Sequence, residues 1–161
     1  MNSNKPILLI EDNPSDIELT KRALQKGRIV NDLVVVEDGQ EALDYLFGAG
    51  LYAGRDTSEL PAVALLDLKL PKVSGLEVLR RIREDKRTRR LPVAILTTSR
   101  EEQDLAAGYD EGANSYVVKP VDFRQFEEAI EQMHLYWLIL NEAPPKPSAE
   151  VNGQVPGLCS V

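Results

Sequence analysis

Acidic, hydroxyl and basic side chains stand at the ends of several short apolar runs in this 161-residue sequence. These residues are Glu11, Asp12, Asp67, Thr97 and Lys119. Carboxylates that lie close together repel one another and resist ionising unless a cation neutralises them. A few carboxylates with several retained waters suit Mg²⁺ and leave room for a phosphate oxygen. If the fold brings these residues together, their chemistry is that of a magnesium site that handles phosphate.

Each of these residues also has a purely structural interpretation. Asp12 can be an acid at the start of a helix, Thr97 a residue that favours strands, and Lys119 a solvated loop charge. Asp67 can cap a turn. The functional interpretation depends on their joint occurrence at the ends of four different strands, which is hard to obtain by chance.

The strand that carries Asp67 is the centre of the predicted fold. Residues 62–70, with the sequence AVALLDLKL, form an apolar run that Pro71 stops. Such a run is typical of a strand buried on both faces of a parallel sheet, although a buried helix segment can share the pattern. Similar runs predict four more strands, at residues 6–10, 32–36, 91–97 and 115–118.

Helical patterns separate the predicted strands. Asn13 before Pro14 is typical of an N-cap followed by proline in the first turn, and Ser99 with Glu102 has the spacing of a capping box. The helices expected after the first one span residues 40–47, 75–84, 99–107 and 122–140. Strands that alternate with helices imply a parallel sheet covered on both faces. Right-handed crossovers bring the carboxyl ends of its strands to one edge, where ligands bind in such sheets.

The composition indicates one globular domain, which we place at residues 1–143, followed by a disordered tail over residues 144–161. No segment reaches the ~20 apolar residues of a membrane span, and the polar N-terminus gives no secretory signal. The single cysteine, Cys159, fits a reducing compartment, so we expect a cytoplasmic protein. A net charge of -7 argues against general nucleic-acid binding. Basic residues within residues 80–90 indicate a solvated helix end or a docking site for an acidic partner.

The combination of motifs resembles the receiver domains of two-component response regulators, over residues 6–140. The resemblance is carried by Glu11 and Asp12 after PILLI, Asp67 in LLDLKLP, Thr97 in ILTTS, and Lys119 in YVVKP. It implies an α/β, flavodoxin-like fold, a doubly wound five-stranded parallel sheet of order 2-1-3-4-5 with five helices.

The resemblance also implies a chemical role for the acidic residues. Asp67 would be the phosphoacceptor, to which a histidine kinase transfers a phosphoryl group. Glu11, Asp12, Asp67 and the backbone carbonyl of Lys69 would hold Mg²⁺. The chain would then be a signalling protein that catalyses only its own phosphorylation and dephosphorylation.

The remaining site residues would respond to the phosphoryl group. By resemblance, Thr97 and Lys119 bind phosphoryl oxygens, and Tyr116 rotates inward with the movement of Thr97 to form a switch. An ordinary strand tyrosine remains the alternative for Tyr116. The resemblance further implies a cis bond between Lys119 and Pro120.

Some positions depart from the usual family pattern or point to a subgroup. Ser74 replaces the usual acid before Gly75, and Lys69 and Ser99 occupy positions that tune the lifetime of the phosphate in the family. The long loop expected at residues 48–60 and the ending YWLILNEAPP resemble single-domain regulators that partner bacterial and cyanobacterial phytochrome histidine kinases. Such a regulator would signal through protein contacts or a phosphorelay.

The last predicted helix suggests a homodimer. One of its apolar stripes should pack on the sheet, and this stripe contains Phe126, Ile130, Met133, Trp137 and Leu140. Three more apolar residues point elsewhere, namely Leu135, Leu138 and Ile139. They would leave an apolar patch on a monomer, so we expect a second copy to bury it. The alternative is that the loop or the tail of the same chain covers the patch.

Other classes of protein fit the sequence less well. A phosphatase of the haloacid dehalogenase type needs a second acid two residues after the first, where this chain has Lys69. A flavin-binding protein of the same fold needs a phosphate loop rich in glycine and hydroxyl groups, which does not follow the first strand. A degenerate receiver that binds partners without phosphorylation is the remaining alternative within the fold.

Overall fold

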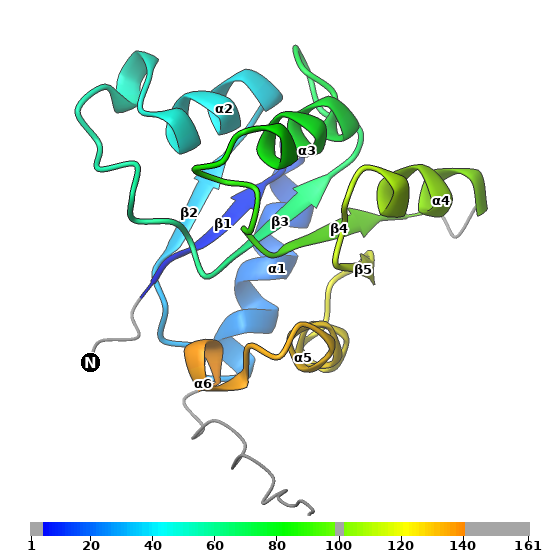
Figure 1. Ribbon diagram of the computed structural model, residues 1–161. Coiled ribbons are helices and arrows are strands. Elements are labelled where there is room, and N and C mark those ends of the chain that lie inside the picture. The colour runs from blue at the N-terminus through cyan, green and yellow to red at the C-terminus, as the bar shows by residue number, and fades with distance from the viewer. Residues whose placement is uncertain (1–4, 99–101, 141–161) are drawn as a thin grey trace, which may run out of the picture.

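The computed structural model describes residues 5–98 and 102–140, and its centre is a single parallel sheet of five strands (Figure 1). The strand order is β2-β1-β3-β4-β5, which confirms the predicted fold. The strands are β1 (Ile7–Ile10), β2 (Leu33–Val36), β3 (Val63–Asp67), β4 (Val93–Thr97) and β5 (Ser115–Val118). Each lies inside the segment predicted for it, apart from β5, whose bounds are those predicted.

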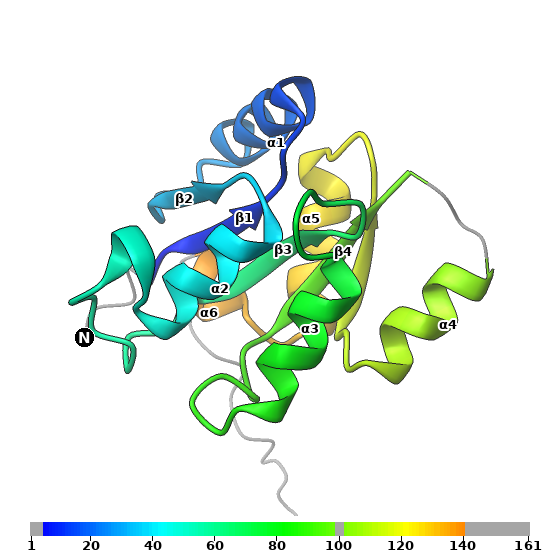
Figure 2. The same ribbon diagram turned by 90° about the horizontal axis from the view of Figure 1, so that it is seen from above.

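Helices cover both faces of this sheet. They are α1 (Pro14–Lys26), α2 (Gly39–Phe47), α3 (Gly75–Glu84), α4 (Glu102–Asp110), α5 (Phe123–Gln132) and α6 (Tyr136–Ile139). One face carries α1, α5 and α6, whereas α2 and α3 lie over the other, with α4 beside the β4–β5 edge (Figures 1 and 2). No helix in the described part of the chain is long and apolar enough to cross a membrane.

Short polar side chains fix where these helices begin. Asn13 accepts the backbone N–H of Asp16 at 3.1 Å, as the sequence predicted for the start of α1. Ser74 accepts the N–H of Glu77 at 3.2 Å, so the residue that replaces the usual family acid caps α3. The predicted cap at Ser99 lies outside the described residues.

Alternate residues of the strands supply the two halves of the core. Leu9 and Leu65 point toward α1, α5 and α6, whereas Leu8 and Leu66 point toward α2 and α3. All four side chains are fully buried. This continuous burial on both faces explains why β3 has no polar alternation in its sequence.

The end of the chain differs from the predicted long helix. α5 stops at Gln132, and His134 adopts a left-handed φ of 59° before α6 begins at Tyr136. The described chain therefore has six α-helices instead of five. A left-handed residue rotates the following turn away from the original helical stripe, so side chains beyond it cannot be placed by extending the period of α5.

This break overturns the predicted placement of Leu135, Ile139 and Trp137, whereas the rest of the predicted stripe, Phe126, Ile130, Met133 and Leu140, packs in the core as expected. Leu135 and Ile139 are only 8% and 2% exposed and belong to the core beneath the sheet, with Leu138 packed against them. Trp137, which was expected to pack on the sheet, is 43% exposed. The apolar patch predicted at Leu135 and Ile139 is therefore buried within the same chain, and a homodimer through it is not supported. The predicted disordered tail lies outside the described residues.

The long loop before β3 is fastened to α2. A short 3-10 helix, η1 (Gly50–Tyr52), places the Tyr52 hydroxyl so that it donates to Glu41 Oε2 at 2.7 Å. Arg55 Nε donates to the carbonyl of Tyr45 at 2.6 Å, and the Arg55 guanidinium lies 4.1 Å from the centre of the Tyr45 ring. These contacts hold the loop in one conformation although it has no regular period.

The Tyr52–Glu41 bond should be visible in an alkaline titration. This bond, with burial, raises the pKa of Tyr52 from its ordinary 10.0 to about 12. Since the folded state keeps the proton longer, the stabilisation is present below pH 10 and is lost as the pH rises toward 12. We expect tyrosinate absorbance to show one late-titrating phenol that Tyr52→Phe removes. An unchanged late component in Tyr52→Phe would contradict this assignment.

Candidate functional site

Three carboxylates meet where β1 and β3 end at the same edge of the sheet. Ile10 of β1 pairs with Leu66 of β3, so the residues that follow them, Glu11 and Asp67, lie side by side. Together with Asp12, each offers one oxygen within 4.8 Å of the others. Both Glu11 and Asp67 are buried. The sequence prediction that these three acids converge is therefore met by the geometry.

Lys119 brings the positive charge of the site. Its side chain is 7% exposed, and its Nζ lies 2.6 Å from Glu11 Oε1 and 3.4 Å from Asp67 Oδ2. The Lys119 backbone N–H donates to the carbonyl of Thr97 at 2.8 Å, which joins the ends of β5 and β4. The bond between Lys119 and Pro120 is cis, as predicted.

The charges of Glu11 and Lys119 depend on each other. Burial raises the pKa of Glu11, and the negative charge of Asp67 raises it further. The hydrogen bond from Lys119 lowers this pKa but does not outweigh the other two effects, so the pKa of Glu11 lies above its usual value. Burial by itself lowers the pKa of Lys119, but its bonds to Glu11 and Asp16 and the charge of Asp67 outweigh it and raise that pKa. Lys119 is therefore a cation that stays protonated in the presence of several acids.

The donor set fits a hard divalent cation. Three carboxylates converge, and the loop after Asp67 turns back so that the Lys69 N–H donates to Asp67 Oδ1 at 3.3 Å. Gly75 allows this close turn, because a Cβ there would lie 2.3 Å from the carbonyl oxygen of Asp67. Oxygen ligands of this kind, with room for water, are those that Mg²⁺ prefers.

These groups line one open cavity of about 390 Å³. Its lining residues are Glu11, Asp12, Asn13, Pro14, Asp16, Asp67, Lys69, Thr98 and Lys119. Sequence reasoning missed Asp16, whose carboxylate accepts from Lys119 Nζ at 3.0 Å. The available signal was its position, because Asp16 is an acid in the first turn of the helix that begins directly after Asp12 and Asn13.

The two predicted switch residues lie on neighbouring strands. Thr97 is the last residue of β4 and is 7% exposed. Tyr116 lies on β5; its hydroxyl donates to the carbonyl of Leu105 in α4, and its ring makes an edge contact with Tyr109 at 4.7 Å between centres. Tyr116 therefore packs against α4, and its movement with Thr97 stays a prediction.

Gly108 leaves the space that the Tyr116 hydroxyl occupies. A Cβ at Gly108 would lie 2.0 Å from that oxygen, so Gly108→Ala should push the ring away from α4. Alanine stabilises a helix by about 1 kcal/mol relative to glycine, and the lost hydrogen bond costs about 1 kcal/mol. We therefore expect little net change in stability, but a loss of NOEs between the Tyr116 ring and α4.

A matched control separates crowding from loss of the bond. Tyr116→Phe removes the hydroxyl without crowding the ring, so its ring should keep the NOEs to α4. NOEs that persist unchanged in Gly108→Ala would contradict the proposed contact.

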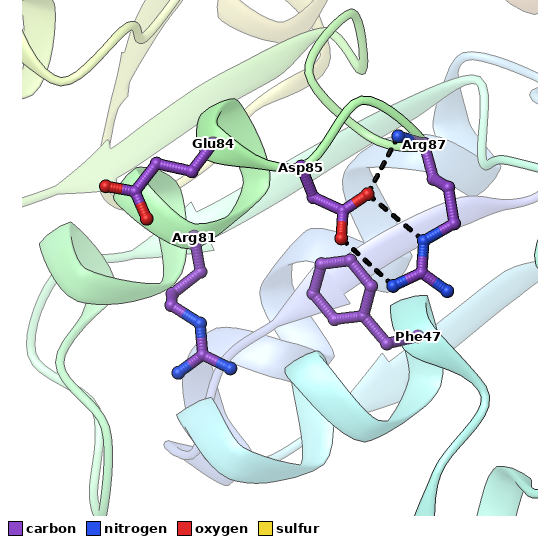
Figure 3. Close-up of a pocket in the computed structure, with 5 residues that line it drawn as sticks. All are labelled: Phe47, Arg81, Glu84, Asp85 and Arg87. Atoms are coloured by element: carbon purple, nitrogen blue, oxygen red, sulfur yellow. Dashed lines mark hydrogen bonds and ion pairs between the residues drawn. The ribbon is translucent and has the colours of Figure 1, made fainter.

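A second cavity, of about 420 Å³, lies between the ends of α2 and α3 (Figure 3). Its lining residues are Phe47, Arg81, Glu84, Asp85 and Arg87. Arg87 is held by Asp85 at 2.9 Å and lies over the Phe47 ring at 4.9 Å. The lining contains both acidic and basic side chains, so the cavity does not offer a surface of one charge sign to a ligand. An acidic partner for the basic residues near it stays untested.

The fold and the site together define a class of protein. The profile of the response regulator receiver domain matches residues 7–131. The chain therefore belongs to the response regulator receiver domain family, as its motifs predicted.

Particular relatives narrow the comparison. The bacteriophytochrome response regulator AtBRR is 54% identical, with a TM-score of 0.77 over 86% of this chain and 98% of that chain. FilR2, a probable methanogenesis regulatory protein of Methanothrix harundinacea, is 41% identical over 86% of each sequence. Response regulator Rcp1 of Synechocystis is 35% identical over 85% of this chain and 91% of its own. The Mn²⁺-bound crystal structure of Rcp1 has a TM-score of 0.69 over 88% of this chain and 99% of that chain.

Proposed function

We propose that this chain is a response regulator whose Asp67 accepts a phosphoryl group from the phosphohistidine of a kinase, in a reaction that depends on Mg²⁺. One observation carries the proposal: three carboxylates and a buried ammonium line a single cavity at the carboxyl edge of the sheet. This is the arrangement that phosphoryl transfer requires, since the reaction depends mainly on alignment and on neutralising charge.

The chain's own residues define the transfer step. A carboxylate oxygen of Asp67 attacks the phosphorus, a P–O bond forms, and the P–N bond to the kinase histidine breaks. The leaving imidazole nitrogen keeps the electron pair and takes up a proton. Lys119, 3.4 Å from Asp67, offsets the negative charge on the phosphoryl oxygens. Thr97, at the end of the neighbouring strand, supplies the hydroxyl that responds to the modification.

Glu11, Asp12, Asp67 and the carbonyl of Lys69 would hold the metal ion. Bound there, Mg²⁺ supplies charge neutralisation and a fixed position for a phosphoryl oxygen. The chemistry of the donor set supports this, as does the relative Rcp1, whose solved form contains Mn²⁺.

The partner we propose is a histidine kinase of the bacteriophytochrome type. This chain is 54% identical to the bacteriophytochrome response regulator AtBRR and 41% identical to the methanogenesis regulator FilR2. The higher identity to AtBRR supports a bacteriophytochrome kinase over a kinase that controls methanogenesis. The output signal would pass through contacts with other proteins or through a phosphorelay. A homodimer, if formed, would use a surface other than Leu135 and Ile139, because these residues are buried within the chain.

The proposal is tested by the intact mass of the protein after incubation with acetyl phosphate. We expect a gain of one phosphoryl group in the presence of Mg²⁺, and no gain once a chelator has removed the metal. A known receiver treated in parallel verifies the conditions. Absence of any gain where that receiver is modified would overturn the proposal in favour of a receiver that binds partners without phosphorylation.

A further inference from the structure

The ammonium of Lys119 is shared among three carboxylates, and Asp67 is the most distant of them. Nζ lies 2.6 Å from Glu11, 3.0 Å from Asp16 and 3.4 Å from Asp67. An ammonium has three N–H donors and no acceptor. Asp16 takes one of these donors in a hydrogen bond, and Glu11 and Asp67 lie within ion-pair distance of the same nitrogen before any phosphoryl group is present.

A phosphoryl group on Asp67 would change this balance. It adds strong acceptor oxygens beside Lys119, and these oxygens compete with Glu11 and Asp16 for its N–H donors. Glu11 is the less suitable of the two to release its donor, because its side chain is 1% exposed and, without the ammonium, only the proposed metal ion could balance its charge. The Asp16 side chain is 26% exposed, so water can solvate its carboxylate when Lys119 leaves.

Local structure aims Asp16 at Lys119. The residue lies in the first turn of α1, where its N–H donates to Asn13 Oδ1 at 3.1 Å. The Thr20 hydroxyl donates to the Asp16 carbonyl at 2.9 Å, one turn later. The positive end of the helix dipole favours a carboxylate at this position. Asp16 is thus held at the cavity that also contains Asp67 and Lys119.

We propose that Asp16 is a positioning residue that holds the Lys119 ammonium in the unphosphorylated state and competes with the phosphoryl group for it. Asp16 is not one of the three carboxylates that converge as metal ligands, and it acts through Lys119, which it contacts at 3.0 Å. Its charge therefore favours the unmodified protein over the modified one. This inference rests on the proposed function, because the competitor for Lys119 is the phosphoryl group on Asp67.

The test uses beryllofluoride, a phosphoryl analogue, with saturating Mg²⁺ and the full chain, with binding followed by ¹⁹F NMR. Asp16→Asn removes the charge and should lower the apparent Kd for beryllofluoride about threefold to fivefold. Asp16→Ser removes the same charge with a different side chain and should give the same gain. Asp16→Glu, which restores the carboxylate, should return the Kd toward that of the unaltered chain.

Glu18→Gln is the matched control, since it makes the same charge change on the same helix but at an exposed residue paired with Arg22 at 3.4 Å. It should leave the Kd unchanged. In a Lys119→Met background, Asp16→Asn should have no effect, because the residue through which it acts is gone.

The outcomes that overturn the inference are distinct from failure of the proposed function. Equal affinity in Asp16→Asn, Asp16→Ser and the unaltered chain overturns the role of Asp16 alone. So does an equal gain in Glu18→Gln, which would indicate a general charge effect, or a gain that persists without Lys119. No binding of beryllofluoride to the unaltered chain overturns the proposed function, and this inference with it.

Discussion

Asp67→Asn is expected to abolish the gain of one phosphoryl group from acetyl phosphate. The amide keeps the shape of the side chain but removes the nucleophilic oxyanion, and Glu11 and Asp12 belong to the proposed metal set. The fold should persist, because Asp67 pairs with Leu96 of β4 through its backbone, which the substitution leaves unchanged. Intact mass with Mg²⁺ measures the loss, and circular dichroism verifies folding.

Asp32→Asn provides a control for this experiment. Asp32 is exposed and precedes β2, at the edge of the sheet opposite the acids. Its variant should be modified to the same extent as the unaltered chain. Modification that survives in Asp67→Asn would mean that Glu11 or Asp12 accepts the phosphoryl group, and the location of the modified residue would then be determined by peptide mapping.

Ile139→Ala is expected to lower the free energy of unfolding by about 2–5 kcal/mol, as for other large apolar side chains deleted from a core. Ile139 is 2% exposed and packs with Leu135 in the core formed by α1, α5 and the sheet. Urea unfolding measures the loss. A change as small as that of a surface substitution would mean that α6 is detached from the domain in solution.

Trp137 gives the control within the same helix. It is 43% exposed, so Trp137→Ala should cost less than about 1 kcal/mol despite removing a larger side chain. We therefore expect Ile139→Ala to destabilise the protein more than Trp137→Ala. One continuous helix, in which Trp137 would face the sheet, would give the opposite order. Light scattering on the same two variants tells whether either side chain holds a second copy.

The residues at the strand ends could be predicted from sequence, because the same local pattern, a short apolar run followed by a polar residue, occurs at each strand. Each apolar run is short, and the residue that follows it emerges at the carboxyl edge of a parallel sheet whatever the exact strand bounds. Thus Glu11, Asp67 and Lys119 could be placed together although four of the five strands proved shorter than predicted. The cap at Asn13 was equally clear, because the sequence signal and the hydrogen bond involve the same few residues.

Two features depended on geometry that the sequence does not show. The break before α6 occurs at His134, which adopts φ 59° without the glycine that commonly marks this conformation. The contact between Asp16 and Lys119 joins the first turn of α1 to the residue after β5, and these two residues are far apart in the chain. Neither the helix break nor this contact can be predicted from the residues that are near it in the sequence.

The position of Lys119 has a consequence for synthesis of the protein. It lies 103 positions after Asp16 in the chain, and the acids of the cavity leave the ribosome long before it does. Until β5 pairs with β4, these acids lack the Lys119 ammonium that contacts them in the folded domain. A nascent chain, or a fragment that ends before β5, therefore holds an incomplete cavity, and the proposed phosphorylation should require nearly the whole domain.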